Sequence, residues 1–448
     1  MMTKIINGRI IKDGKITEGT LYFADGKILC PCEAKKLGEA DQVIDAKGNY
    51  VSAGFIDLHL HGGGGYDFLD GTEEAFEGAA AFHAKHGTTA MCPTATSGEF
   101  EATLEMFRSY KAIKEKDRLG SDFIGLHMEG PYFALSQKGA QDPRYVRDPD
   151  PEEYERFLNA TDDIVRWSVA PERDKGYAFA KALTARGISV AAAHTDANCR
   201  QMLEAAENGY THMTHFYSCM KGVERVNGMR IAGAIEAAYL SDDITVEIIA
   251  DGMHLPYELL QMVYKLKGAD RTALVTDAMR GAGMPEGIET VLGKLDNGLP
   301  CRIEKGVAWM LDGQAFAGSV ATTDRLVRTM VAAGIPLVDA VKMASETPAK
   351  MAKCATKGTL DAGKDADIVI FDEAINMQHV FVRGKQIVLL KMIAGENFLK
   401  KVFPCTPFKN FCTKISKENS KETDGRAARG ETSLWLSRFC RGHRDPTK

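Results

Sequence analysis

The sequence lacks long apolar runs. No stretch of about 18 consecutive apolar residues occurs, so we expect no membrane-spanning helix. The start, MMTKIINGRIIKDGK, has no apolar segment of the kind that a signal peptide requires. The 10 cysteines are scattered and form no Cys-x-x-Cys pair, which favours reduced thiols over a disulfide framework. Together these absences predict a cytoplasmic protein.

A strong excess of one charge sign is also missing. The formal net charge of the 448 residues is only −5, which gives no indication of nucleic-acid binding. The charge is unevenly spread, because residues 396–448 hold 12 Lys and Arg against 6 Asp and Glu, a net charge of +6, and residues 1–395 therefore carry −11. This basic tail has no regular apolar pattern, so we expect it to be disordered or loosely attached.

Short apolar runs separated by turn residues occupy both ends of the first 395 residues. Asn7-Gly8, Asp13-Gly14 and Asp25-Gly26 each separate two such runs, which predicts hairpins. A similar pattern returns between residues 363 and 388. We predict that residues 1–50 and 355–395 form one small β-sandwich, divided in sequence by residues 51–354.

Between these ends, apolar strands alternate with helical patterns. Three of the helical patterns stop at a glycine, Gly87, Gly187 or Gly209, where a helix C-cap is expected. Eight alternating strands predict a (β/α)8 TIM-like barrel. A doubly wound open sheet is the alternative, but it would place a phosphate-binding glycine loop directly after the first strand, where this chain has histidines. The predicted strands are 55–60, 88–93, 123–128, 165–170, 188–193, 211–215, 244–250 and 273–276.

Metal-binding and acid/base side chains collect where these strands end. His59 and His61 share one face at the end of the first strand, just before four glycines. Alone, His-x-His could be two ordinary polar residues. However, the carboxyl ends of barrel strands meet at one face, and five further strands end in such residues. These are His127 and Glu129, His194 and Asp196, His212 and His215, Asp251 and His254, and Asp277.

The ligand chemistry predicts a metal-dependent hydrolase. Glu129, His194 and His215 would make a three-ligand site with an open position, and His59 and His61 would complete a second site that Glu129 bridges. One or two divalent ions per subunit are expected, and zinc, iron, manganese and cobalt all suit these ligands. Such an ion lowers the pKa of bound water and so supplies hydroxide as a nucleophile near neutral pH.

The remaining acidic residues and histidines have predicted catalytic or structural roles. Asp277 is the predicted general base, which would pass the proton on to the leaving group. His127 could share the face of Glu129 or support it from behind. His83 and His86 lie on a predicted helix and are expected to be surface or packing residues. Asp57 could simply anchor the end of the first strand.

Eight motifs give the chain a family resemblance. With these motifs and their spacing, residues 3 to about 390 resemble the N-acetylglucosamine-6-phosphate deacetylases of the amidohydrolase superfamily. The resemblance implies hydrolysis of N-acetyl-D-glucosamine 6-phosphate to D-glucosamine 6-phosphate and acetate, in amino-sugar catabolism, by a homodimer or higher homo-oligomer. The motifs are AGFIDLHLHG, GLHMEGPYF, KGAQ, AAHTDA, THFYSCM, IIADGMHL, LVTDAM and FAGSVAT.

The resemblance also implies roles for single residues. Glu129, His194 and His215 match the family's metal ligands, and Asp277 matches its acid/base. Arg225 matches an arginine that binds the substrate phosphate, in relatives across a subunit boundary; paired donors and a permanent charge suit that role. The residues that match substrate-contacting positions are Ala140, Gln141, Ser218, Cys219, Asp251, His254, Phe316, Ala317 and Gly318.

Two departures bear on the substrate and the metals. Ser218 and Cys219 stand where many relatives have Asn-Ala, which puts the identity of the sugar in doubt more than the reaction. Both His59 and His61 are present, although some relatives lack this pair, so a binuclear site is expected. The alternatives are a deacetylase of another N-acyl sugar, a cyclic amidase, a deaminase, or a non-catalytic homologue. The complete set of ligands and base disfavours the last of these.

Overall fold

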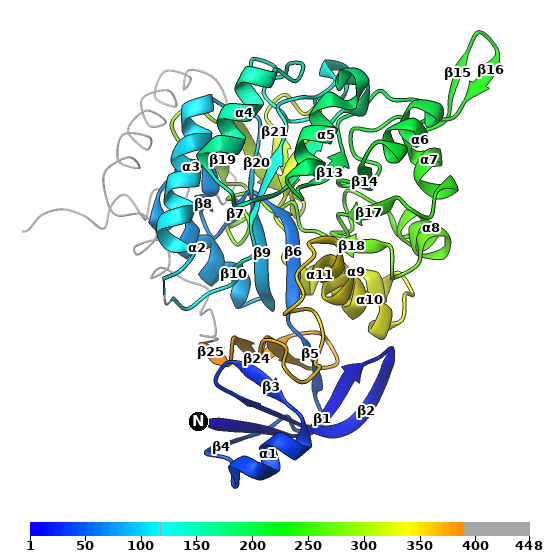
Figure 1. The fold of residues 1–448 in the computed structure, drawn as a ribbon. Coiled ribbons are helices and arrows are strands. Elements are labelled where there is room, and N and C mark those ends of the chain that lie inside the picture. The colour runs from blue at the N-terminus through cyan, green and yellow to red at the C-terminus, as the bar shows by residue number, and fades with distance from the viewer. Residues whose placement is uncertain (117, 389–448) are drawn as a thin grey trace, which may run out of the picture. The chain divides into compact units, whose positions relative to one another are not determined.

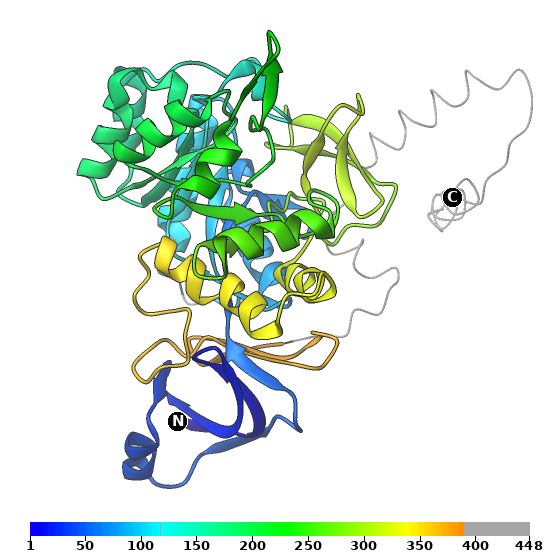
Figure 2. The same cartoon turned by 90° about the vertical axis from the view of Figure 1, so that its right-hand side faces the viewer.

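The computed structural model describes residues 1–116 and 118–388. The predicted basic tail (396–448) and residues 389–395 of the predicted sandwich lie outside the described residues. Figures 1 and 2 show a barrel ringed by helices and, beside it, a separate β-sheet that contains the N-terminus. Among the described helices, none is long and apolar enough to cross a membrane.

The predicted (β/α)8 barrel is confirmed. Its parallel strands pair with one another in chain order, and a bridge between Leu60 and Ala278 closes the ring. The predicted strand at 123–128 is divided into β10 (Asp122–Phe123) and a barrel strand. The barrel strands are β6 (Phe55–Leu60), β9 (Thr88–Ala95), β11 (Leu126–Glu129), β12 (Ile164–Val169), β13 (Ser189–Ala192), β14 (Tyr210–Met213), β17 (Thr245–Ile248) and β18 (Thr272–Leu274).

Capping residues mark the ends of several helices. In helix α6 (Cys199–Glu207), Asn198 and Gln201 form a reciprocal capping box. The three glycines predicted to end helices all have a positive φ, as a left-handed C-cap requires. The other helices are α1 (Pro31–Leu37), α2 (Glu73–Ala84), α3 (Phe100–Ile113), α4 (Pro151–Ala160), α5 (Ala178–Ala185), α7 (Ala234–Leu240), α8 (Tyr257–Lys267), α9 (Thr323–Ala332), α10 (Leu337–Ala344) and α11 (Glu346–Met351).

The apolar core lies between the strands and the helices and reaches the site. Trp167 on β12 is fully buried, with its ring 5.1 Å from that of Phe179 and 5.9 Å from that of Tyr132. Its indole N–H donates to the carbonyl oxygen of Gly130 at 2.7 Å. Because Gly130 directly follows Glu129, the core packing also fixes the end of β11.

Both terminal segments join in one small β unit, as predicted. Strand β5 (Tyr50–Ala53) pairs with β1 on one side and with β23 on the other, so one continuous sheet crosses the two segments. The buried cation Lys357 bonds Asp122 of β10 and Asp367, both at 2.7 Å, and ties this sheet to the barrel. The remaining strands are β1 (Met2–Lys12), β2 (Lys15–Ala24), β3 (Lys27–Leu29), β4 (Gln42–Asp45), β23 (Ile368–Phe371), β24 (Met377–Val382) and β25 (Lys385–Ile387).

Two local predictions in this unit are wrong. Asn7-Gly8 does not turn the chain but forms a bulge within β1, where Gly8 leaves room for Val51: a Cβ on Gly8 would lie 2.6 Å from that side chain. Cys30 and Cys32 form a disulfide instead of staying reduced. The sequence contains no Cys-x-x-Cys pair, but the start of α1 brings together two cysteines with one residue between them.

Several strands beyond the barrel were not predicted. After β18 the chain forms an antiparallel sheet that we call the inserted sheet: β19 (Glu289–Leu292), β20 (Leu299–Glu304), β21 (Val307–Met310) and β22 (Phe316–Ser319). A β15 (Glu224–Val226) and β16 (Met229–Ile231) hairpin projects from the body in both views (Figures 1 and 2). Two short strands, β7 (Gly62–Gly63) and β8 (Tyr66–Asp67), follow β6.

Candidate metal centre

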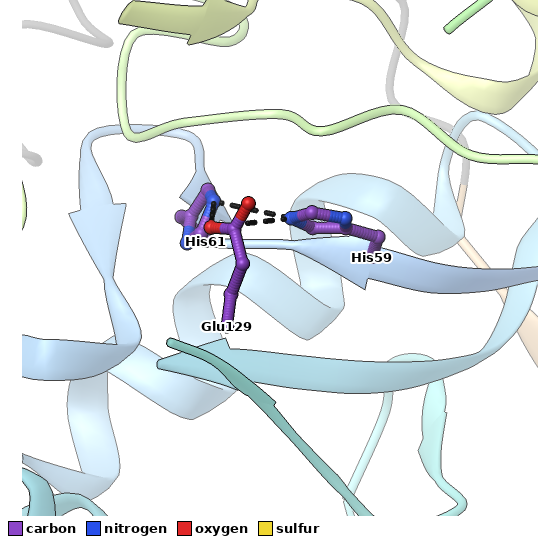
Figure 3. A group of neighbouring side chains, drawn as sticks. All are labelled: His59, His61 and Glu129. Atoms are coloured by element: carbon purple, nitrogen blue, oxygen red, sulfur yellow. Dashed lines mark hydrogen bonds and ion pairs between the residues drawn. The ribbon is translucent and has the colours of Figure 1, made fainter. Parts of the chain in front are cut away.

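Glu129 lies between two pairs of histidines. Its Oε1 is 3.2 Å from Nε2 of His194 and 2.9 Å from Nε2 of His215. Its Oε2 is 3.3 Å from Nε2 of His61 and 3.6 Å from Nε2 of His59 (Figure 3). All five side chains are buried. The predicted ligands therefore meet at one point, in two trios that share the Glu129 carboxylate.

The donor set fits a divalent metal. Within each trio the ligand atoms lie within 4.8 Å of one another. Nδ1 of His194 donates to the carbonyl oxygen of Gln137 at 2.8 Å, which leaves its Nε2 lone pair free to bind an ion. Nε2 atoms also face each other, at 3.1 Å between His194 and His215 and at 3.4 Å between His59 and His61. Facing lone pairs around a buried carboxylate are an arrangement that a cation stabilises.

The electrostatics of Glu129 agree with a ligand role. Burial alone would raise its pKa, but the His59, His194 and His215 imidazoles around it hold the pKa of this carboxyl well below its usual value. Glu129 is therefore ionised over the whole range of neutral pH, as a metal-binding carboxylate must be.

Asp277 faces the same centre from the end of β18. Its Oδ1 is 3.2 Å from Nε2 of His61 and 3.4 Å from Nε2 of His59. Burial would raise the pKa of Asp277, but these two imidazoles hold it below its usual value. The carboxylate is ionised near neutral pH and can accept a proton, as the predicted base requires.

Three residues of the centre adopt a left-handed backbone. The φ angles of His194, His215 and Asp277 are +46°, +33° and +49°. Such values are uncommon for residues other than glycine, and they concentrate at functional sites. Each residue lies two or three positions after the end of a barrel strand, at the face where the ligands meet.

An open cavity of about 260 Å³ adjoins the centre. Three of the predicted substrate residues do not reach it: Arg225 lies on the β15–β16 hairpin, Asp251 is buried behind His254, and Ala317 packs into the core of the inserted sheet. The cavity is lined by the predicted residues Ala140, Gln141, Ser218, Cys219, His254, Phe316 and Gly318, together with Thr96, Gly139, Leu292 and Ala315, which the sequence argument missed.

Gln141 is held in a fixed orientation. Its Oε1 accepts hydrogen bonds from Oγ1 of Thr96 at 2.8 Å and from the backbone N–H of Ser97 at 2.9 Å. Its Nε2 donates to Oε2 of Glu129 at 2.8 Å. Gln141 therefore orients the bridging carboxylate directly. Thr96 directly follows β9, at the face where the strands end, and this position could have indicated the contact.

His254 and Asp251 form a dyad at the cavity. Nδ1 of His254 donates to Oδ2 of Asp251 at 2.8 Å, and Oδ1 of Asp251 accepts from the backbone N–H groups of Met253 and His254. The His254 ring lies 4.8 Å from the ring of Phe316. With Nδ1 engaged, Nε2 is the atom of His254 available to a ligand.

Arg225 does not reach the cavity of its own chain. It lies on the exposed β15–β16 hairpin, directly opposite Arg230. Among the described residues that line the cavity, none is Lys or Arg. An anionic substrate group in this cavity thus lacks a cation from the lining itself.

The other histidines have structural partners. His127 bonds Thr94 and Ser168 behind the ligands and belongs to neither trio. His83 is a packing residue: it is fully buried, and its Nε2 donates to the carbonyl oxygen of Gly62 at 2.8 Å. His212 contacts Thr245. These contacts account for His83, His127 and His212, three of the histidines that the trios leave out.

Comparisons with known proteins agree with this geometry. The amidohydrolase family model matches residues 50–397. The N-acetylglucosamine-6-phosphate deacetylase of Lysinibacillus sphaericus is 30% identical over 378 residues, which cover 83% of this chain and 94% of that protein.

Two solved structures show the same fold. One is the enzyme of that name from Pasteurella multocida, with a TM-score of 0.77 and 28% identity, covering 86% of this chain and 99% of that one. The other is a mutant N-acetyl-D-glucosamine-6-phosphate deacetylase from Mycobacterium smegmatis in complex with N-acetyl-D-glucosamine-6-phosphate. Its TM-score is 0.76 at 29% identity, and the match covers 87% of this chain and 99% of that one. The chain therefore belongs to the amidohydrolase family, and its resemblance to the N-acetylglucosamine-6-phosphate deacetylases is confirmed.

Proposed function

We propose that this chain hydrolyses the acetamide of N-acetyl-D-glucosamine 6-phosphate to D-glucosamine 6-phosphate and acetate. The observation that carries the proposal is the meeting of two histidine pairs, Glu129 and Asp277 at one cavity. The relatives reported above are named as deacetylases of this sugar phosphate, and the chain covers 94% and 99% of the lengths of two of them.

The two trios support two divalent ions per subunit, drawn from zinc, iron, manganese or cobalt. His59, His61 and Glu129 would hold one ion, and Glu129, His194 and His215 the other. When bound, such ions lower the pKa of water and polarise the substrate carbonyl. Cytoplasmic location stays a prediction from the sequence.

The chain's own residues would move the proton and orient the amide. Asp277 takes a proton from the attacking water and delivers it to the nitrogen of the leaving amine. His254 is held by the Asp251 carboxylate and presents Nε2 to the cavity, where it would contact the substrate carbonyl. Gln141 keeps Glu129 in place throughout.

The phosphate would be recognised in a homodimer. The cavity lining offers no Lys or Arg, whereas Arg225 stands on a projecting hairpin without an ion-pair partner in the described part of its own chain. The same hairpin exposes Val226 and Met229, whose side chains would be buried against a second copy. We therefore place Arg225 at the cavity of the neighbouring subunit.

The test is acetate release from N-acetylglucosamine 6-phosphate and from the unphosphorylated sugar, with and without a chelator. Rapid release from the phosphorylated sugar alone, lost with the chelator, supports the proposal. If protein shown to contain metal releases acetate from neither sugar, the proposed substrate is wrong and another N-acyl sugar is favoured. Ser218 and Cys219 line the cavity, so they are then the first residues to mutate in a search for the residues that select the sugar.

A further inference from the structure

The wall of the cavity is anchored by a buried arginine. Leu292, at the end of β19, lines the cavity from the inserted sheet. Arg280, three residues after Asp277, lies beneath this point and is only 3% exposed. We propose that Arg280 is a positioning residue, which fixes Leu292 relative to the loop that follows the ligand His61 and thereby sets substrate affinity. This inference rests on the proposed function, because it treats Leu292 as a wall of that substrate site.

Arg280 holds both neighbours of Leu292. Its Nε donates to the carbonyl oxygen of Val291 at 3.3 Å, and its Nη2 donates to that of Gly293 at 2.9 Å. Leu292 therefore lies between two carbonyl groups that are bound by one guanidinium. Because the guanidinium is planar and rigid, it fixes the spacing of these two groups.

The same guanidinium binds the loop that follows His61. Nη1 donates to the carbonyl oxygen of Gly65 at 3.1 Å, and a bidentate ion pair joins Arg280 to Asp70, at 2.7 Å and 3.1 Å. This loop is tied to the metal centre, since the backbone N–H of Phe68 donates to the carbonyl oxygen of His61 at 2.9 Å. Arg280 thus joins the metal-ligand loop to the cavity wall with a full set of hydrogen bonds.

Two carboxylates complete the junction. Oδ2 of Asp67 accepts from the backbone N–H of Gly293 at 3.2 Å, and Oδ1 of Asp70 accepts from that of Leu295 at 3.0 Å. Both acids belong to the loop after His61. Without Arg280, Asp67 and Asp70 would be mostly buried carboxylates without a cation, which would lower the stability of this junction.

Leu292 also has contacts of its own, because it pairs with Leu299 of β20 and packs into an apolar cluster. On the outer side of the sheet, Lys294 pairs with Glu105 at 3.0 Å and Asn297 donates to Glu99 at 3.2 Å. These outer side chains are half-buried or exposed, and such contacts contribute little to stability. Loss of Arg280 therefore removes the hydrogen bonds that fix the backbone on both sides of Leu292, while the five metal ligands keep their own contacts.

The test compares Arg280→Gln and Arg280→Lys with a matched control, Arg302→Gln. Arg302 lies on β20 of the same sheet, in an exposed ion pair with Glu289. Arg280→Gln should raise KM for the phosphosugar at least 10-fold, change kcat less than 3-fold and keep the metal content. Arg280→Lys, which retains the charge but cannot serve both carbonyls, should give a smaller rise in KM. The control should change neither constant.

Hydrogen exchange gives a readout that needs no substrate. Amides of residues 291–295 should exchange at least 10-fold faster in Arg280→Lys than in wild type, and should be unchanged in Arg302→Gln. If the protein proved inactive on the proposed substrate, this measurement would still decide the role of Arg280. Unchanged exchange at these amides would overturn the inference.

A double variant tests whether Arg280 acts through Leu292. Leu292→Ala should raise KM, and adding Arg280→Lys to it should raise KM by clearly less than the product of the two single effects. Fully multiplicative effects would overturn the inference. So would a parallel loss of kcat and metal in the Arg280 variants, because Arg280 would then support the centre and not the wall.

Discussion

Asp57 and Thr276 join the first and last barrel strands directly below the metal ligands. Oδ2 of Asp57 accepts from Oγ1 of Thr276 at 2.5 Å, and its Oδ1 accepts from the backbone N–H groups of Thr276 and His59 at 3.2 Å. Both side chains are buried. The backbones of the two segments also meet near Leu60 and Ala278. Asp57 thus helps to close the ring beneath His59 and Asp277.

Asp57→Ala should destabilise the closed barrel. It removes three accepted hydrogen bonds in a buried position, so we expect the free energy of unfolding to fall by about 3 kcal/mol. Asp57→Asn is the matched control, because its amide oxygen can still accept from both backbone N–H groups, and its cost should be about 1 kcal/mol or less. Chemical denaturation measures both. Equal losses for the two variants would show that the charge, and not the bonding pattern, matters here.

Asp277→Asn should abolish turnover and leave the metals bound. The amide has the shape of the carboxylate and tolerates the left-handed backbone at this position, but it cannot take up a proton. We expect kcat to fall about 1,000-fold. Metal analysis of the same preparation supplies the control. Activity within a few fold of wild type would refute the role of Asp277 as the base.

The two trios predict how metal content responds to single changes. His61→Asn should leave about one ion per subunit, because the trio of Glu129, His194 and His215 stays intact. Glu129→Gln should remove both ions, because each trio loses its carboxylate. His127→Asn is the control: His127 is buried beside the ligands but belongs to neither trio, so both ions should remain. A second ion that persists in His61→Asn would contradict the assignment.

The metal centre could be predicted from the sequence because it depends on local pattern and on one topological rule. Strand alternation places His59 and His61 on one face, and barrel topology brings the ends of distant strands together. Side chains at those ends, such as Glu129 and His215, must then meet. Neither strand alternation nor barrel topology depends on the conformation of the loops.

The surrounding wall could not be predicted, because it depends on loops that fold against one another. Leu292 and Thr96 lie in segments without a distinctive pattern, and they reach the cavity only through contacts such as those of Arg280 and Gln141. The bulge at Gly8 was mistaken for a turn because its sequence suits both. Only packing against Val51 distinguishes the two.

Arg225→Gln should weaken binding of the phosphorylated sugar. Loss of a charge-assisted contact should raise KM by about 10-fold to 100-fold with a small change in kcat. Arg302→Gln, which also removes an exposed arginine, should leave KM unchanged. An unchanged KM in Arg225→Gln would remove this residue from the phosphate site.

Mixing two variants decides whether Arg225 serves the neighbouring subunit. The Asp277→Asn variant lacks the base but keeps Arg225, and the Arg225→Gln variant keeps the base but lacks the arginine. If the arginine acts across the dimer, each mixed dimer contains one site with both residues intact. Subunit exchange should then restore activity at low substrate concentration. Activity no higher than the sum of the separate variants would place Arg225 in its own subunit's site or outside it.

His83 should make stability depend on pH in the acid range. Burial is the largest effect on its pKa, which it lowers from 6.5 to about 4, so the folded protein holds His83 neutral. Below about pH 6.5 the unfolded chain takes up a proton that the folded chain takes up only near pH 4. Stability therefore falls as the pH drops through this interval, by about 3 kcal/mol in total.

The variant His83→Gln isolates this contribution. Its side-chain amide can still donate to the carbonyl oxygen of Gly62, but it does not titrate. The unfolding free energy of wild type minus that of His83→Gln should therefore be constant from pH 7 to 8. It should then decrease by about 3 kcal/mol between pH 7 and pH 4. Contributions from the other histidines cancel in this difference, because both proteins contain them. A difference that stays constant down to pH 4 would show that His83 is protonated in the folded state without cost.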